Sequence, residues 1–156
     1  MQVREGNVHD WPFIYNLGKK GIMDSISPWR KQSIEETLRY RNEFLTGFWA
    51  WIEKTGSVVF IVEAETQSFG YLVLHTTARE ELTGLVQGWI MDIGVVPEWR
   101  GKGVGQLLLK TAETYCRAQK ISYLGLAVSS HNVRALKLYE KCGFAEERKL
   151  LVKCVD

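Results

Sequence analysis

Hydrophobic residues change their spacing about one third of the way along the chain. Before residue 52 they recur at helical intervals, which predicts helices over residues 8–20 and 33–47. Ser33 and Glu36, three residues apart, form a capping box that supports the start of the second helix. With a short edge strand expected over residues 1–5, this part of the chain is predicted to be mostly helical and rich in aromatic side chains.

Beyond that point the pattern is typical of strands. Residues 57–63 and 69–77 are rich in β-branched and aromatic residues, and the short polar turn between them predicts a hairpin. A further strand over residues 89–96 stops at Pro97, which has no N–H to donate to a neighbouring strand.

The rest of the chain alternates helices and strands. A helix is expected over residues 103–119, a strand over 121–128, and a helix over 131–142 that ends at Gly143. The first two, with the strand before them, form a βαβ crossover, so its two strands should be parallel. Residues 144–155 are expected to add one or two closing strands. The predicted fold class is α/β (α+β): a mixed, mostly antiparallel twisted sheet of six to seven strands, with a central parallel βαβ unit and helices on both faces.

The composition changes this picture little. The 156 residues are 46% hydrophobic and 24% charged, which is ordinary for a folded protein and fits a single domain over residues 1–156. A net charge of +2 is too small to indicate a nucleic-acid or membrane surface, and no apolar stretch approaches the ~20 residues of a membrane span. The three cysteines form no CxxC pair, so neither a disulfide framework nor a metal site is expected, and reduced thiols favour a cytoplasmic protein.

A glycine-dense turn follows the strand at residues 89–96 and leads directly into a helix. Glycine lets the backbone turn with its N–H groups inward, and the unpaired N–H groups and positive dipole of a helix start suit a phosphate. A P-loop fails because Lys102 is followed by glycine, and a dinucleotide loop fails because Gln106 replaces the third glycine of G-x-G-x-x-G. The pattern Arg-x-x-Gly-x-Gly remains, formed by Arg100, Gly103 and Gly105. A simpler interpretation is that the three glycines only shape a loop.

A second informative run, residues 132–144, begins a helix. Asn132 and Tyr139 are seven residues apart, which places them on one helical face about 10 Å from each other. An amide and a phenol so arranged could flank an extended ligand. Alternatively, Asn132 is only the N-cap of the helix and Tyr139 is a core aromatic residue.

Together these two runs resemble the GNAT superfamily of acetyl-CoA-dependent N-acetyltransferases. The matching segments are Ile93-Gly94-Val95-Val96-Pro97-Glu98-Trp99-Arg100-Gly101-Lys102-Gly103-Val104-Gly105 and Asn132-x-x-Ala135-x-x-Leu138-Tyr139-Glu140-Lys141-x-Gly143-Phe144. They occur in the family's order, one strand apart, and the preceding hairpin also looks like the family's second and third strands. The resemblance covers about residues 57–147, and residues 1–56 match in layout only.

The resemblance implies a sheet splayed open between its fourth and fifth strands, with acetyl-CoA as co-substrate in the cleft and no metal. The pyrophosphate would be held by Arg100, Gly101, Lys102, Gly103, Val104 and Gly105. The segment Ile93-Gly94-Val95 would pair through its main chain with the pantetheine arm, like an extra strand. Asn132 would hydrogen-bond the same arm, and Tyr139 would lie near the thioester sulfur.

The implied reaction is direct attack of a neutral primary amine on the thioester in a ternary complex. The Val95 N–H is the expected donor to the developing oxyanion, and Tyr139 is the expected general acid for the leaving thiolate. Asp92, in an apolar strand, is the candidate general base because burial would raise its pKa; a structural carboxylate is equally consistent with its position. His131 is expected at the surface, and no cysteine has a partner that indicates covalent catalysis.

Two other functions stay open. A non-catalytic CoA- or acetyl-CoA-sensing module of the same fold would bind without turnover, and an anion-binding nucleotide protein is a more distant alternative. The acceptor is expected to be a small-molecule or peptide amine that contacts residues before Ser57 and the loop around residues 79–86. No nucleic-acid or membrane partner is expected, and a homodimer stays open.

Overall fold

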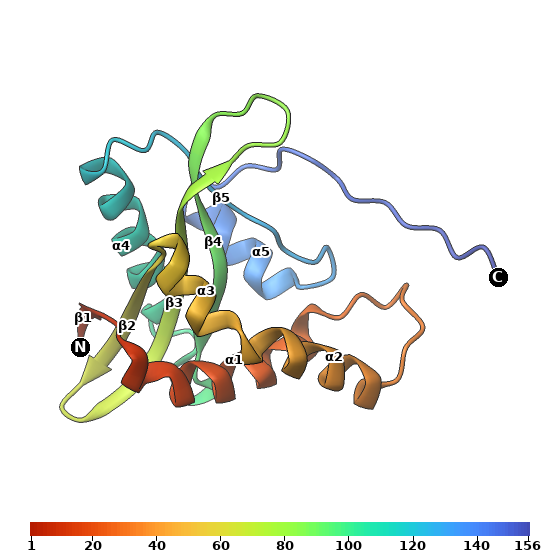
Figure 1. Ribbon diagram of the computed structural model, residues 1–156, viewed down its shortest axis with the longest axis horizontal. Coiled ribbons are helices and arrows are strands. Elements are labelled where there is room, and N and C mark those ends of the chain that lie inside the picture. Colours follow the sequence, from red (N-terminus) through yellow and green to blue (C-terminus); the bar gives the residue numbers. More distant parts are fainter.

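One five-stranded sheet organises the chain in the computed structural model, which describes residues 1–156 (Figure 1). The strands follow chain order across the sheet: β1 (Gln2–Glu5), β2 (Val58–Ala64), β3 (Gln67–Arg79), β4 (Val86–Val95) and β5 (Leu124–Leu126). Each pair of neighbours from β1 to β4 is antiparallel, and β4 pairs with β5 in parallel. The mixed α/β class and the parallel βαβ unit are therefore confirmed.

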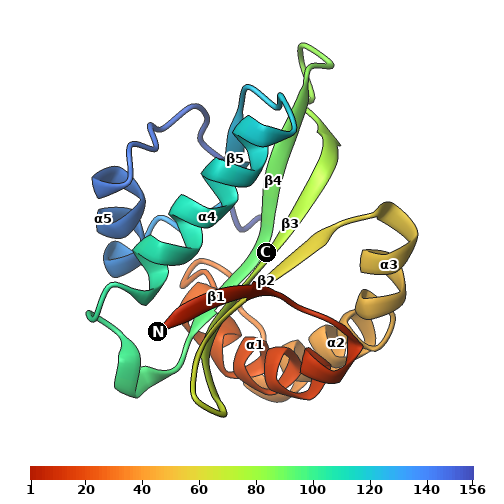
Figure 2. The same cartoon turned by 90° about the vertical axis from the view of Figure 1, so that its left-hand side faces the viewer.

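Helices lie on both sides of this sheet. One side carries α1 (Trp11–Ser25), α2 (Ile34–Thr46) and α3 (Phe48–Thr55), and the other carries α4 (Val104–Ala118) and α5 (Val133–Lys141) (Figure 2). Short 3-10 turns, Val8–Asp10 and Pro97–Trp99, come before α1 and before the glycine loop. None of the helices combines the length and apolar character needed to cross a membrane.

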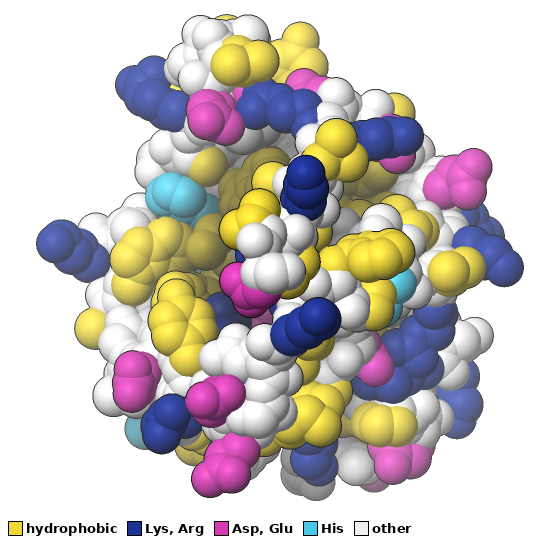
Figure 3. Space-filling view, turned by 90° about the vertical axis from the view of Figure 1, so that its right-hand side faces the viewer, with side chains coloured by type: hydrophobic (Ala, Val, Ile, Leu, Met, Phe, Trp, Pro, Cys, Tyr) yellow, Lys and Arg dark blue, Asp and Glu magenta, His cyan; other side chains and the backbone are white.

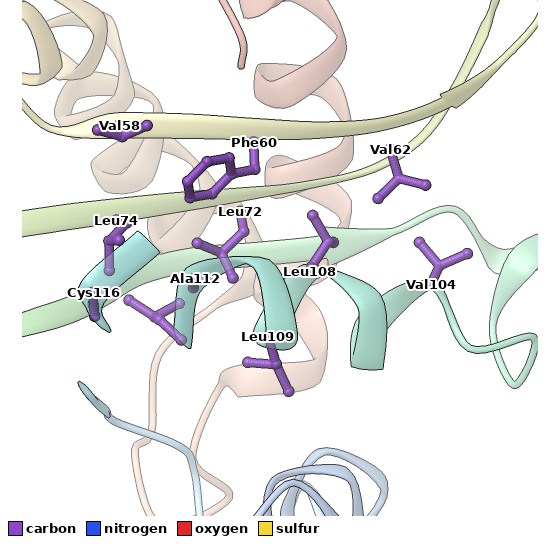
Figure 4. Packing of buried hydrophobic residues seen from close by; sticks show 11 residues of the cluster. Val58, Phe60, Val62, Leu72, Leu74, Val104, Leu108, Leu109, Ala112 and Cys116 are labelled. Atoms are coloured by element: carbon purple, nitrogen blue, oxygen red, sulfur yellow. The ribbon is translucent and has the colours of Figure 1, made fainter. Parts of the chain in front are cut away.

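Strand β2 shows why the sheet has two hydrophobic cores. Val58, Phe60 and Val62 face α4, whereas Val59 and Ile61 face α1, so the strand is buried on both sides and forms a continuous apolar run. On its side, α4 contributes a stripe with a period of four residues, formed by Val104, Leu108, Ala112 and Cys116 (Figure 4). The sheet is thereby covered on both faces.

The parting of β4 from β5 creates the open edge on which the candidate site is built. Only residues 88–90 of β4 pair with β5, and residues 91–95, the β4 edge, have no strand partner on that side. At the point of separation, Val73 of β3 pairs with Asp92 and Leu74 pairs with Ile90, so Met91 is an extra residue in a bulge. A bulge bends its strand, which accounts for the divergence. The expected splay between the fourth and fifth strands is confirmed.

The sheet has five strands rather than the six or seven expected. Residues 145–156 form no strand and extend away from the sheet, with Leu150 and Leu151 almost fully exposed (Figure 1). An extended segment becomes a strand only where a free edge accepts it, and β5 offers three residues instead of the predicted eight over residues 121–128. The segment is tied down by Arg148, which pairs with Glu80 and Glu81.

Helix α3 is a second difference from the prediction. Gly47 ends α2 and immediately starts α3, so one residue serves as C-cap and N-cap. A glycine after a periodic segment indicates a stop, and nothing in the sequence pattern marks the restart. The Ser33 capping box, in contrast, is present as predicted.

Candidate functional site

The glycine loop, residues 100–105, joins the Pro97–Trp99 turn to α4. Gly101 and Gly103 have φ angles of +77° and +85°, where a side chain would be strained, and a Cβ on either would meet no atom within 4 Å. Gly105 has a different environment, because its Cβ would lie 3.0 Å from Cδ2 of Leu138 on α5. The first two glycines therefore leave open space beside the loop, and the third lets α5 approach α4.

The backbone N–H groups of this loop have no acceptor in the protein. No hydrogen bond is donated by the N–H groups of Gly101, Gly103, Val104, Gly105 or Gln106. They stand at the N-terminus of a helix of 15 residues, where the helix dipole is positive. Lys102 adds a cation, its Nζ 4.9 Å from the centre of the Trp99 ring. This arrangement suits a phosphate group.

Arg100 is turned back towards the β4 edge. Its Nε donates to the carbonyl oxygen of Val95 at 3.2 Å, and its Nη2 lies 3.7 Å from Oδ2 of Asp24 on α1. The same Asp24 oxygen lies 3.5 Å from Nη2 of Arg134 on α5. An acidic side chain is thus placed between two arginines at the loop end of the site. A hollow of about 470 Å³ adjoins it, lined by Met23, Asp24, His131, Asn132, Val133 and Arg134.

The β4 edge presents main-chain groups of alternate residues to its open side. The N–H of Val96 donates to Phe69 on β3, and successive residues of a strand direct these groups to opposite sides. Ile93 and Val95 therefore direct their N–H and C=O groups away from β3. Gly94 has a packing role instead, because its Cβ would lie 2.6 Å from the Tyr71 ring.

On α5, Asn132 is the N-cap, as in the simpler of its two interpretations. Its Oδ1 accepts the N–H of Ala135 at 3.2 Å, which leaves the Nδ2 protons as donors beside the hollow. His131 is exposed, as expected.

Tyr139 lies two turns after Asn132 on the same helical face. Its ring packs edge-on against Phe144, with the ring centroids 5.9 Å apart. It also packs against the core under α4. Burial raises the pKa of its hydroxyl, and the charge of Asp92 raises that pKa further. Tyr139 therefore combines core packing with a hydroxyl that lies within the electrostatic reach of Asp92.

Asp92 lies on the opposite side of β4, under α1. Its Oδ2 accepts a hydrogen bond from the Tyr71 hydroxyl at 2.7 Å. A Cβ on Gly18 would lie 2.8 Å from that hydroxyl and 3.2 Å from the Asp92 oxygen, so this glycine lets α1 pack over the pair. Burial raises the pKa of Asp92, whereas the Tyr71 hydroxyl, the N–H of Ile93 and the charge of Arg41 lower it. The residues predicted as acid and base thus approach the open edge from its two sides.

Three residues near the site were not predicted from the sequence. Tyr71 and Arg41 accompany Asp92, and Asp24 bridges the two arginines. The sequence contains a signal for only one of them: the charged Arg41 lies between Leu38 and Leu45 on the face of α2 that packs inward.

Several aromatic side chains of the helical region are exposed, namely Trp29, Tyr40 and Phe44. Figure 3 shows hydrophobic side chains around a hollow on the side of the molecule from which the C-terminal segment projects.

An open strand edge that ends at a donor-rich helix start is the main feature of the site, and the chain as a whole is similar to known proteins. The sequence model of a protein family described as "Acetyltransferase (GNAT) family" matches residues 22–144 of the chain. The uncharacterised N-acetyltransferase YhfO of Bacillus subtilis (strain 168) is 31% identical over 108 residues, which cover 69% of this chain and 71% of YhfO.

Solved structures agree on the fold. A mutant of the BH1408 protein from Bacillus halodurans superposes with a TM-score of 0.76 at 20% identity, covering 99% of both chains. AAC(6')-Iy in complex with the bisubstrate analogue CoA-S-monomethyl-acetylneamine has a TM-score of 0.66 at 18% identity, covering 98% of this chain and 97% of that one. The chain belongs to the GNAT family of acetyltransferases and is an acetyl-transferring enzyme.

Proposed function

We propose that the chain transfers an acetyl group from acetyl-CoA to a primary amine, by direct attack in a ternary complex. One observation carries this proposal: the unpaired β4 edge runs into a loop with five unpartnered N–H groups, those of Gly101 and residues 103–106. A ligand with an extended amide-containing arm and a pyrophosphate at its end is complementary to both features. The residues present therefore fit acetyl-CoA.

The parts of the ligand are assigned to this chain as follows. The pyrophosphate is bound by the main chain of the glycine loop, with Lys102 as a nearby cation. Ile93 and Val95 hydrogen-bond the pantetheine arm, and the free Nδ2 of Asn132 donates to it from α5. Arg100 and Arg134 gain an anionic ligand in place of Asp24, because a phosphate oxygen and a carboxylate oxygen accept the same hydrogen bonds.

Acetyl-CoA supplies an activated acetyl group as a thioester. The amine nitrogen forms the new bond to the acetyl carbon while the carbon–sulfur bond breaks. The Val95 N–H donates to the acetyl oxygen as that oxygen becomes negative. Asp92 accepts the proton lost by the amine, since its raised pKa makes it a stronger base than an exposed carboxylate.

Tyr139 supplies the proton that the leaving sulfur needs. Its raised pKa keeps the hydroxyl protonated at neutral pH. A thiol has a pKa of about 8.5 and an ordinary tyrosine about 10, so proton transfer to the thiolate is uphill and requires close contact.

The acceptor side lies under α1, α2 and α3, where Asp92 and the exposed aromatic side chains are found. The bisubstrate analogue bound by AAC(6')-Iy joins CoA to acetylneamine. A small-molecule or peptide amine is the acceptor class that we propose for this chain.

Calorimetry with acetyl-CoA, followed by a CoA-release assay over a panel of amines, tests the function. Micromolar binding and amine-dependent release are expected. Binding without release for any amine would indicate a non-catalytic CoA-binding module instead. Stabilisation by ATP but not by acetyl-CoA would indicate a nucleotide-binding protein.

A further inference from the structure

Arg41 places a charge on the face of α2 that packs inward. It follows Leu38 by three residues and precedes the buried Leu45 by four, which are spacings of one helical face. Its Nε is buried without a hydrogen-bond partner, and no other buried side-chain nitrogen or oxygen in the structure is in this state. A buried donor that the chain leaves unpaired is costly, so the position of Arg41 calls for a physical reason.

The guanidinium is nevertheless held in place. Its Cζ lies 4.6 Å from the centre of the Phe44 ring, so the cation stacks on an aromatic side chain of the same helix. Leu45, one turn further along α2, packs in the same core cluster as Tyr71, so Arg41 and the Tyr71–Asp92 pair lie on one side of the sheet. In keeping with this, the charge of Arg41 lowers the pKa of Asp92 and that of Tyr71. Arg41 forms no ion pair with Asp92, whose oxygen is bonded to Tyr71 instead. The guanidinium and the carboxyl group thus lie on the same side of the sheet without forming an ion pair.

The other arginines near the site differ from Arg41 in this respect. Arg100 and Arg134 already share Asp24, and both lie at the loop end of the site. Arg41 is on the side of Asp92, where the proposed function places the amine. Its two Nη groups are not buried and form no hydrogen bond or ion pair in the protein, so they are available to a second group on the acceptor.

We propose that Arg41 binds a carboxylate of the acceptor, so that the substrate is an amino carboxylate whose amine faces Asp92. This inference rests on the proposed function and names its acceptor class. A guanidinium donates two parallel hydrogen bonds to a carboxylate, a geometry that lysine does not reproduce. The amine end then faces Asp92, so the two ends of such a substrate are complementary to a guanidinium and to a carboxyl group.

Matched substrates test the proposal on the unmodified enzyme. Glycine, β-alanine and 4-aminobutyrate differ in the spacing of amine and carboxylate, and each is compared with its carboxamide in the CoA-release assay. For at least one spacing, kcat/KM should be about 10-fold or more higher for the acid, mainly through KM, as expected for a charged hydrogen bond. Equal kcat/KM for acid and carboxamide at every spacing would overturn the proposal.

Two helix variants localise the effect. Arg41→Gln should bring the ratio of kcat/KM for acid over carboxamide close to one, and Arg41→Lys should restore part of that ratio. Arg39→Gln removes an exposed charge from the same helix and should leave the ratio unchanged. Equal losses for acid and carboxamide in Arg41→Gln, or loss of the ratio in Arg39→Gln, would show that Arg41 does not bind the carboxylate.

The outcomes separate this inference from the proposed function. If no amine releases CoA, the proposed function fails. If amines without a carboxylate react as well as the amino acids, and Arg41→Gln has no effect, only the inference about Arg41 fails. Acetyl-CoA affinity should be the same in all these proteins, because Arg41 lies on the acceptor side of β4.

Discussion

The two sides of the β4 edge meet their ligands with different parts of the chain. On the α4 side, most of the proposed contacts are main-chain N–H and C=O groups of the glycine loop and of residues 93 and 95, and side chains such as Lys102 and Asn132 add to them. On the α1 side, the proposed contacts are side chains only, namely Arg41 and Asp92, which is hydrogen-bonded to Tyr71. A main-chain site demands glycines at fixed positions, whereas a side-chain site can be rebuilt with other residues on the same helices.

This difference has a functional consequence. The main-chain side suits a ligand that every member of a family shares, and the side-chain side suits an acceptor that differs between members. Variants on one side should therefore leave binding on the other side intact. The predictions below test that independence and the roles of single residues on each side.

The largest effect is expected for Gly103→Glu. The substitution strains a residue with a φ of +85° and places a negative charge beside the proposed pyrophosphate position. Acetyl-CoA affinity should fall by at least about 100-fold, which corresponds to ~2.8 kcal/mol. Gly84→Glu is the matched control, because Gly84 has a φ of +68° in the β3–β4 turn and equally open surroundings. If calorimetry gave the two folded variants the same affinity, the loop would not be the anion site.

Tyr139→Phe should lower kcat by about 100-fold, the scale of a positioned general acid. The ring packing on Phe144 is kept, so the melting temperature and the acetyl-CoA affinity should change little. Steady-state kinetics and thermal melts of the same preparation separate the two roles of this residue. A normal kcat with a lowered melting temperature would make Tyr139 a core residue only.

Asp92→Asn should change the pH dependence of stability. Because burial raises the pKa of Asp92, the folded protein binds its proton more tightly than the unfolded chain does. The resulting stability is full below the unfolded pKa and is lost as the pH rises through the folded pKa. The variant should therefore melt a few degrees above the wild type at pH 7, with a difference that shrinks towards pH 4. A constant difference across this range would contradict the raised pKa.

The smallest effect is expected for Ser33→Ala at the start of α2. Loss of the cap should destabilise the protein by about 1 kcal/mol, because the Ser33 hydroxyl accepts the N–H of Glu36 at 3.1 Å. The acceptor KM should rise as α2 frays, and acetyl-CoA affinity should stay constant. A parallel loss of acetyl-CoA affinity would show that the two sides of the β4 edge are coupled.

The same division explains how much could be predicted from the sequence. The hairpin, the βαβ unit and the Ser33 capping box follow from periodicity and local chemistry, and the glycine loop follows from its motif. The bulge at Met91 could not be predicted, because it depends on the register of β3 against β4. The hydrogen bond between Tyr71 and Asp92 depends on that same register. The absence of a hydrogen-bond partner for Nε of Arg41 depends on how α2 packs.

Two local ambiguities have a comparable origin. Asn132 is compatible with a cap and with a ligand contact, and the structure gives it the cap while leaving one group free. The sequence predicts one or two closing strands over residues 144–155, but a strand also requires a free edge long enough to accept it. Sequence patterns describe what a segment can form, and the packing of the remaining chain decides which partner is available.

Amide hydrogen exchange, measured by NMR with and without acetyl-CoA, tests the central claim most directly, because it reports on each main-chain donor without altering the backbone. Slower exchange is predicted at Gly101, at residues 103–106 and at Val95, the amides with no acceptor in the protein or directed to the open side of β4. The amides of α2 should be unaffected. Unchanged exchange at the loop and at Val95 under saturating acetyl-CoA would contradict a main-chain binding site.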